Sequence, residues 1–246
     1  MMRVLLCLFF LLFPLGALAQ NNILAVDLAE DHVDITSGFN GAQLVLFGVK
    51  DKPGDVAVVI RGPRHTIAVR RKEQVAGMWL NRRAMKFRNV PLYYDYALSR
   101  PEKQLSKGDN LKEAGIGLDA LYFTPDDSSE DAQYIQNFQE AMIRTKQTQG
   151  LYPLKPKGVK FLQNNFFRVS FYLPANVPIG TYEVESYLLK DGEVLEDHTT
   201  QLRVGQVGFG ARVYQFAQRH GFSYGLVCVL MAVMAGWAVN LLRQRD

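Results

Sequence analysis

The sequence predicts a mainly β exported domain that is held at a membrane by one C-terminal helix. Short segments rich in Val, Ile, Leu and Thr alternate with turn residues through the middle of the chain, as is typical of antiparallel sheets. From Phe167 to Leu173, apolar and polar side chains alternate, which is typical of a strand with one buried face. The third observation is that the only two long apolar stretches lie at the two ends of the chain.

Residues 1–19 have the pattern of a cleavable secretory signal peptide. One basic residue, Arg3, precedes an uncharged run from Val4 to Phe13, and the small-residue motif Ala17-Leu18-Ala19 provides a cleavage site. The run is short for a retained membrane anchor. We therefore expect the mature chain to begin near Gln20 and its body to be exported.

Residues 222–242 are predicted to form a transmembrane helix. This run has 21 residues without Asp, Glu, Lys or Arg, and at about 1.5 Å per residue it covers a hydrocarbon core of roughly 30 Å. The alternative, a buried core helix, is disfavoured because a helix that is apolar on every side has few places to be buried in a small protein. A stem at 206–221, either a helix on the lipid surface or a plain connector, would precede the span. With the signal removed, the protein would lie in the bacterial inner membrane, with its body in the periplasm and residues 243–246 as a cytoplasmic tail.

Both cysteines lie in the terminal segments, Cys7 in the predicted signal and Cys228 in the predicted span. The exported domain therefore has no disulfide, no thiol chemistry and no cysteine-ligated zinc. Residues 20–205 number 186, which is enough to bury a core without disulfide bonds.

The exported domain is expected to comprise a β-rich region at 20–127, a helix at 128–150 and closing strands at 151–205. The helix is predicted at Ser129–Gln147, with Ser128 or Ser129 as its N-cap and Gly150 as its end. Its core-facing residues are expected to be Ile135, Phe138 and Met142. The strands expected in the first region are Val33–Thr36, Ala42–Phe47, Val56–Arg61, Thr66–Arg70, Val75–Leu80, Met85–Arg88 and Tyr93–Leu98.

The clearest local motif begins at Pro178-Ile179-Gly180-Thr181-Tyr182 and continues to an Asp191-Gly192 hairpin turn. This combination resembles the closing strands of immunoglobulin-like envelope domains. The resemblance implies an immunoglobulin-like β-sandwich, one or two in number, with an inserted amphipathic helix. The resemblance implies a fold and does not imply a function.

A basic stripe runs from Arg61 to Lys103, with eleven Lys or Arg against three acidic residues, between flanks that each have a net charge of −4. One interpretation is a solvated sheet face with compensating contacts. The sharper hypothesis is a surface for anionic lipid headgroups, an anionic envelope polymer or a small anion. Nucleic acid is disfavoured by the compartment and by the lack of interleaved aromatic residues. The candidate binding residues are Arg61, Arg70, Arg71, Lys72, Trp79 and Arg82.

Motifs for catalysis are absent from the sequence. The histidines, His32, His65, His198 and His220, lie far apart and show no metal-ligand spacing. The acidic segment at 126–131 lacks the spacing of a calcium loop and is explained by helix capping. We therefore expect a protein that is not an enzyme and holds no metal or cofactor. The alternatives are a periplasmic hydrolase, built where His65 or His198 meets a serine or carboxylate, and a purely structural tether.

Small residues are spaced along the predicted span in a way that favours contact between helices. They indicate a membrane-protein partner. These residues are Gly221, Gly225, Ala232 and Gly236.

Over nearly its whole length the chain resembles an alphaproteobacterial family of transmembrane proteins. The resemblance is carried by Val58-Val59-Ile60-Arg61-Gly62-Pro63, Val75-Ala76-Gly77-Met78-Trp79, Ser99-Arg100-Pro101 and Gly115-Ile116-Gly117-Leu118. It implies a signal peptide, an exported domain and one C-terminal helix, without an activity or catalytic residues. An association of such proteins with sulfite-exporter-like permeases would imply a role accessory to a membrane transporter.

Overall fold

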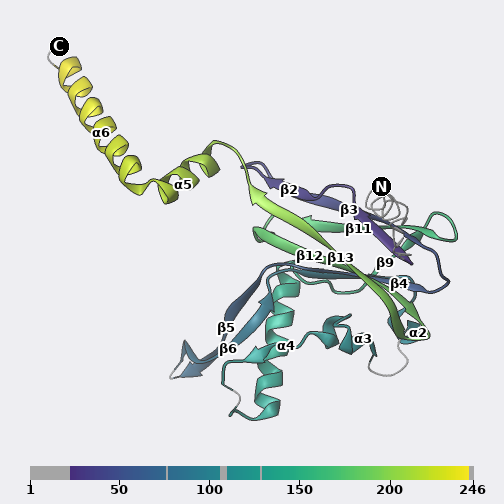
Figure 1. Cartoon of the computed structure of the whole chain (residues 1–246). Coiled ribbons are helices and arrows are strands. Elements are labelled where there is room, and N and C mark those ends of the chain that lie inside the picture. Colours follow the sequence, from purple (N-terminus) through teal and green to yellow (C-terminus); the bar gives the residue numbers. More distant parts are fainter. Residues whose placement is uncertain (1–22, 76, 106–109, 128, 244–246) are drawn as a thin grey trace, which may run out of the picture.

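The computed structural model describes residues 23–243, apart from residue 76, residues 106–109 and residue 128. The predicted signal peptide at 1–19 and residues 244–246 of the predicted tail lie outside the described residues. Within the described part the protein is mainly β, with three sheets and a set of helices (Figure 1).

The first sheet is antiparallel throughout and has four strands in the order β1-β3-β11-β10. Its strand β11 shows the predicted alternation, because Phe167, Val169, Phe171 and Leu173 are all buried. The strands are β1 (Leu24–Leu28), β3 (Gly41–Lys50), β10 (Lys160–Phe161) and β11 (Phe166–Pro174).

The second sheet has six strands in the order β2-β13-β12-β4-β7-β9, with parallel pairs at its two edges. The predicted hairpin turn between β12 and β13 is confirmed, since Asp191 and Gly192 both have positive φ, 54° and 90°. The strands are β2 (His32–Ile35), β4 (Asp55–Arg61), β7 (Tyr94–Leu98), β9 (Lys157–Gly158), β12 (Gly180–Lys190) and β13 (Glu193–Gln206).

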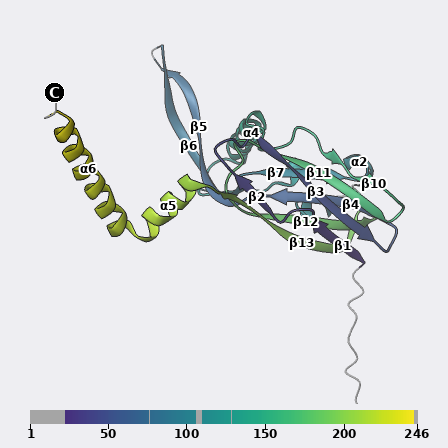
Figure 2. The same cartoon turned by 90° about the horizontal axis from the view of Figure 1, so that it is seen from above.

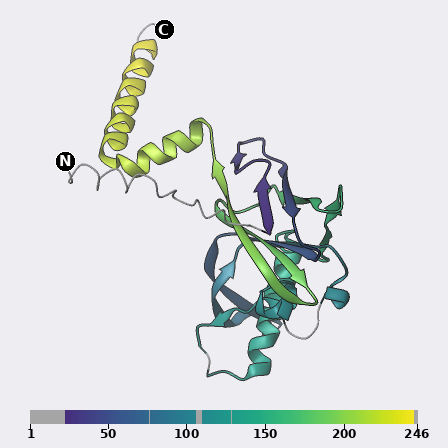
Figure 3. The same cartoon turned by 45° about the vertical axis from the view of Figure 1, so that its right-hand side comes forward.

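Side chains from both sheets belong to one hydrophobic core, which includes Leu46 of β3 and Val184 of β12. Strand β4 is buried at every position from Val56 to Ile60 because a helical layer covers the other face of its sheet. Figures 1 and 3 show the second sheet between the strands of the first sheet and this layer. The layer holds α2 (Glu102–Leu105), α3 (Asn110–Glu113), the 3-10 helix η2 (Leu118–Ala120) and α4 (Ala132–Thr148).

A third sheet is built on a long hairpin of β5 (Arg64–Val75) and β6 (Met78–Pro91), with the short strand β8 (Thr124–Pro125) beside β6. Figure 2 shows the hairpin projecting from the body. The predicted strand Val75–Leu80 is wrong, because the chain reverses there and Val75 pairs with Met78. The physical reason is Gly77, whose φ of +83° is readily adopted only by glycine.

Helix α4 begins three residues later than predicted, at Ala132, with Asp131 as its N-cap. The predicted N-cap Ser129 instead donates from its backbone N–H and its hydroxyl to Asp127 Oδ1, at 3.0 and 2.6 Å, in the turn before the helix. The other predicted N-cap, Ser128, lies outside the described residues. Phe138 and Met142 are buried as predicted, and the positive φ of Gly150, 71°, ends the helix.

Two helices follow β13, α5 (Phe209–Arg219) and α6 (Gly221–Arg243). Among the described residues, no single helix is both long and apolar enough to cross a membrane. Together, Arg212–Arg219 and Gly221–Trp237 have the necessary length and apolar composition, as a pair bent by 114°.

The close contact between β3 and β11 makes a first prediction. Gly48 lies opposite Phe167, whose ring is fully buried, and a Cβ at position 48 would overlap that ring. We expect Gly48→Ala to lower the free energy of unfolding by about 1–3 kcal/mol, because a packed core cannot take the added methyl group without strain. Urea unfolding of the full-length protein in mild detergent measures this. Gly38→Ala is the control, since nothing lies within 4 Å of its added Cβ.

Candidate functional site

The strongest candidate site is a groove of about 560 Å³ between strand β5 and helix α4. We call it the basic groove. Its lining residues are Val69, Arg70 and Arg71 of β5 and Tyr134, Asn137, Phe138, Glu140, Ala141 and Arg144 of α4.

Local structure explains why these side chains meet. Adjacent residues of a regular strand point to opposite faces, yet Arg70 and Arg71 both line the groove beside a register shift between Arg71 and Lys72. A β-bulge of this kind re-aims side chains. On α4, the residues Asn137 and Arg144 are seven apart, two helical turns, and therefore lie on the same face.

The electrostatics of the basic groove are unbalanced. Arg70, Arg71 and Arg144 are exposed, and in the described part of the chain no carboxylate pairs with any of them. The one carboxylate of the groove, Glu140, accepts a hydrogen bond from Gln136 Nε2 at 3.0 Å. Three guanidinium groups against one carboxylate make the groove suited to an anion that has several oxygen atoms.

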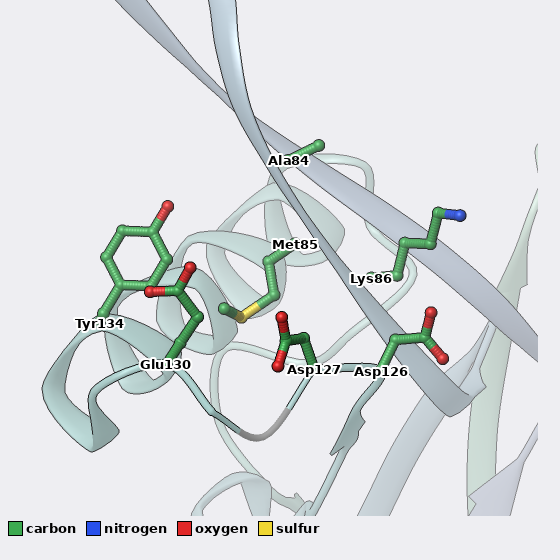
Figure 4. Close-up of a pocket in the computed structure, with 7 residues that line it drawn as sticks. All are labelled: Ala84, Met85, Lys86, Asp126, Asp127, Glu130 and Tyr134. Atoms are coloured by element: carbon green, nitrogen blue, oxygen red, sulfur yellow. The ribbon is translucent and has the colours of Figure 1, made fainter.

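A second pocket, of about 360 Å³, lies between β6 and the start of α4 and shares Tyr134 with the basic groove. Figure 4 shows the carboxylates of Asp127 and Glu130 on either side of the Met85 side chain, and that of Asp126 nearer to Lys86. Local partners engage two of them: Arg88 Nε lies 3.4 Å from Asp126, and hydrogen bonds from Ser129 lower the pKa of Asp127. Within the described ranges no group of three or more His, Cys, Asp or Glu residues is placed to hold a metal ion.

Arg61 is not part of the basic groove. Its side chain is 11% exposed and forms an ion pair with Glu185, while Nη2 donates to the carbonyl oxygen of Gly115 at 2.9 Å. It lines another pocket, with Arg64 and Tyr187 among its neighbours. Of the remaining candidates, Lys72 lies in β5 and Trp79 and Arg82 in β6, but their side chains lie outside the described part of the structure.

The structure therefore brings Arg70 and Arg71 together and leaves Arg61 apart. Sequence reasoning missed Arg144 and Tyr134, because the charge count stopped at Lys103 and α4 belongs to a segment of net negative charge. A helical projection of residues 134–144 would have placed Tyr134 on the face that carries Phe138, and Arg144 beside Asn137 on the adjoining face.

In the part of the chain that the structure describes, His65 and His198 stand apart from the serine or carboxylate that the hydrolase hypothesis places beside them. His65 of β5 is exposed and His198 of β13 is half-buried. Among the described residues, neither forms a hydrogen bond with a serine hydroxyl or a carboxylate. His32 pairs with its neighbour Asp31 at 3.0 Å on the surface, and the His220 ring lies 5.5 Å from that of Phe216.

The small residues of the predicted membrane contact lie along one face of α6. An added Cβ at Gly221, Gly225 or Gly236 meets nothing within 4 Å. With Ala232, these positions leave a strip where a second helix can approach closely.

Comparison with known proteins places the chain in a family. A search of curated proteins gives no match. A family model with the description "Putative transmembrane protein (Alph_Pro_TM)" matches residues 23–245. This range takes in all three sheets and both C-terminal helices. The chain therefore belongs to this family of transmembrane proteins.

Proposed function

We propose that the protein is a single-pass envelope protein whose exported domain is a non-enzymatic module that binds an anionic group in the basic groove. The observation that carries the proposal is the set of three exposed guanidinium groups that have no carboxylate partner in the described residues. Charged hydrogen bonds from arginine to phosphate or carboxylate oxygens are among the stronger polar contacts in proteins. A purely structural tether would have no use for such a groove.

The topology of the proposal follows from α6. The segment Gly221–Trp237 alone falls short of a span, but α6 continues to Arg243, and its 23 residues would extend about 34 Å as a helix, against a hydrocarbon core of roughly 30 Å. We infer that α6 spans the inner membrane, that the sheets lie in the periplasm, and that the two facing sheets form an immunoglobulin-like sandwich. The Asp191-Gly192 hairpin and the shared core support the last point.

A membrane-protein partner is part of the proposal. The open face of α6 at Gly221, Gly225 and Gly236 would let a second helix pack closely. An accessory role beside a transporter would use both ends of the molecule, the groove for an anionic ligand or envelope polymer and α6 for the partner.

Anion binding is tested with tripolyphosphate as the probe, titrated calorimetrically into the full-length protein in mild detergent. We expect saturable binding that Arg70→Ala weakens about tenfold or more, because a charged hydrogen bond contributes about 1.5–3 kcal/mol. Arg71→Ala and Arg144→Ala should act in the same direction.

The matched control is Arg203→Ala, which removes an exposed arginine from β13, away from the groove. It should leave the affinity unchanged. An equal loss in this control would show that the probe senses only net charge, and the absence of saturable binding would refute the proposed function.

A further inference from the structure

The β5–β6 hairpin is long for the sheet that it belongs to. Its strands have 12 and 14 residues, whereas β8 pairs with only two residues of β6, Phe87 and Arg88. Figures 1 and 2 both show the far end of the hairpin standing away from the body. At about 3.3 Å per residue, a 12-residue strand reaches roughly 40 Å.

The far end of the hairpin is apolar. Val75, Met78, Trp79 and Leu80 surround the turn at Gly77, and we call these four residues the apolar tip. Met78 has 63% of its surface exposed. A solvated hairpin end normally carries polar turn residues, so this composition favours an apolar partner.

Basic residues follow the apolar tip on both strands. Arg70, Arg71 and Lys72 stand on β5, Arg82 and Arg83 on β6, and we call these five the basic collar. The register places Arg71 directly opposite Arg83. Basic residues gathered on both strands at this level favour an anionic surface around the collar.

The hairpin leaves the body at the same end as the C-terminal helices. Arg61, the last residue of β4, pairs with Glu183, which in turn pairs with Gln201 of β13. Strands β4 and β13 are both antiparallel to β12, so they run in the same direction. The hairpin begins three residues after β4, and α5 begins three residues after β13, beyond that shared end.

We propose that the apolar tip inserts into the periplasmic face of the membrane that α6 spans, with the basic collar on anionic lipid headgroups. Arg71 is four residues from Val75, about 13 Å along the strand. That distance places the collar at headgroup level when the tip reaches the acyl chains. Attraction of basic residues to anionic lipids acts over such short distances. The inference rests on the proposed span of α6.

Tryptophan fluorescence tests this inference, because the chain has two tryptophans, Trp79 in the tip and Trp237 in α6. The full-length Trp237→Phe protein is reconstituted into vesicles of phosphatidylethanolamine and phosphatidylglycerol, with or without brominated acyl chains. We expect bromination to cause a loss of Trp79 emission and aqueous iodide to have little effect. Met78→Asp should reverse both results, since a carboxylate at the tip opposes insertion. Leu154→Asp, at an exposed position of the body, should change neither.

The arms of the experiment separate this inference from the proposals on which it rests. The Trp79→Phe protein reports Trp237, and quenching of Trp237 by brominated lipid supports the span of α6. Quenching of Trp237 without quenching of Trp79 overturns tip insertion and leaves tripolyphosphate binding as a separate result. Insertion that is equally strong in vesicles of phosphatidylcholine alone overturns the role of the collar. Protection of Trp79 from both iodide and brominated lipid would mean contact with protein, and also overturns the inference.

Discussion

Arg61→Ala is expected to lower the free energy of unfolding by about 3 kcal/mol, because it leaves the largely buried carboxylate of Glu185 without its cation. The two side chains are only 11% and 18% exposed. Urea unfolding of the full-length protein in mild detergent measures the loss.

The large effect has two sources in the structure. Glu185 Oε2 accepts hydrogen bonds from both Arg61 and the Tyr187 hydroxyl, so removal of Arg61 leaves this oxygen with a neutral donor in place of its cation. In addition, Arg61 Nη2 holds the carbonyl oxygen of Gly115, at the end of the α3 turn. The arginine therefore ties the helical layer to the sheet, and its removal should loosen both.

Two further variants make the expectation specific. Glu185→Gln in the Arg61→Ala background removes the orphaned charge and should recover part of the loss. Arg70→Ala removes an exposed arginine of the basic groove and should change the unfolding free energy by less than about 0.5 kcal/mol. A loss of similar size in Arg70→Ala and Arg61→Ala would contradict the assignment of one to binding and the other to the fold.

The contrast between these two arginines shows what the sequence could and could not predict. Both lie in the same basic stripe, and the stripe predicts a surface. Arg61 is only 11% exposed because it pairs with Glu185. The two residues are 124 apart in the sequence, so no local pattern predicts the pair. Arg70 and Arg71 keep their predicted exposure because the strand that carries them projects from the body.

Strands were predictable where side-chain pattern and turn chemistry agreed. Alternation fixed the buried face of β11, and Asp191-Gly192 fixed the following hairpin, because both signals are local. The prediction of one strand at Val75–Leu80 was wrong because it gave the apolar β-forming residues more weight than the single glycine at the turn. The short helices α2 and α3 were missed for a different reason. Four-residue helices have too little periodicity to be read from sequence, and they form only because Leu105 and Leu111 pack on the sheet.

A second buried charge, on Asp95, pairs with Lys157 of the edge strand β9 in the same sheet. Asp95 of β7 is 5% exposed and lies 2.5 Å from Lys157 Nζ, and it accepts a hydrogen bond from the backbone N–H of Tyr96 at 2.9 Å. The Lys157 ammonium also lies 5.2 Å from the centre of the Phe171 ring. Burial raises the pKa of Asp95, and Lys157 opposes that rise.

The sign of the resulting pH dependence follows from that direction. A raised pKa means that the folded state holds the proton of Asp95 more tightly than the unfolded state does. The contribution of Asp95 to stability is therefore fully present below its ordinary value of 3.8 and is lost as the pH rises through the folded-state pKa. Without Lys157 the pKa of Asp95 would rise further, and the loss would extend to higher pH.

Lys157→Ala is accordingly expected to destabilise the protein by an amount that depends on pH. At neutral pH the variant should lose about 3 kcal/mol of unfolding free energy, because an ionised Asp95 would be buried without a cation. Below pH 3.8 the carboxyl is neutral, and the loss should fall to about 0.5–1 kcal/mol, the contribution of the cation on the Phe171 ring. Urea unfolding of the full-length protein across this pH range, beside the Asp95→Asn/Lys157→Ala double variant, measures the difference.

The double variant has no charge to titrate at this position, so its loss of unfolding free energy should not change with pH. Parallel stability profiles for wild type and Lys157→Ala would show instead that the lysine acts only by packing and that Asp95 is neutral throughout.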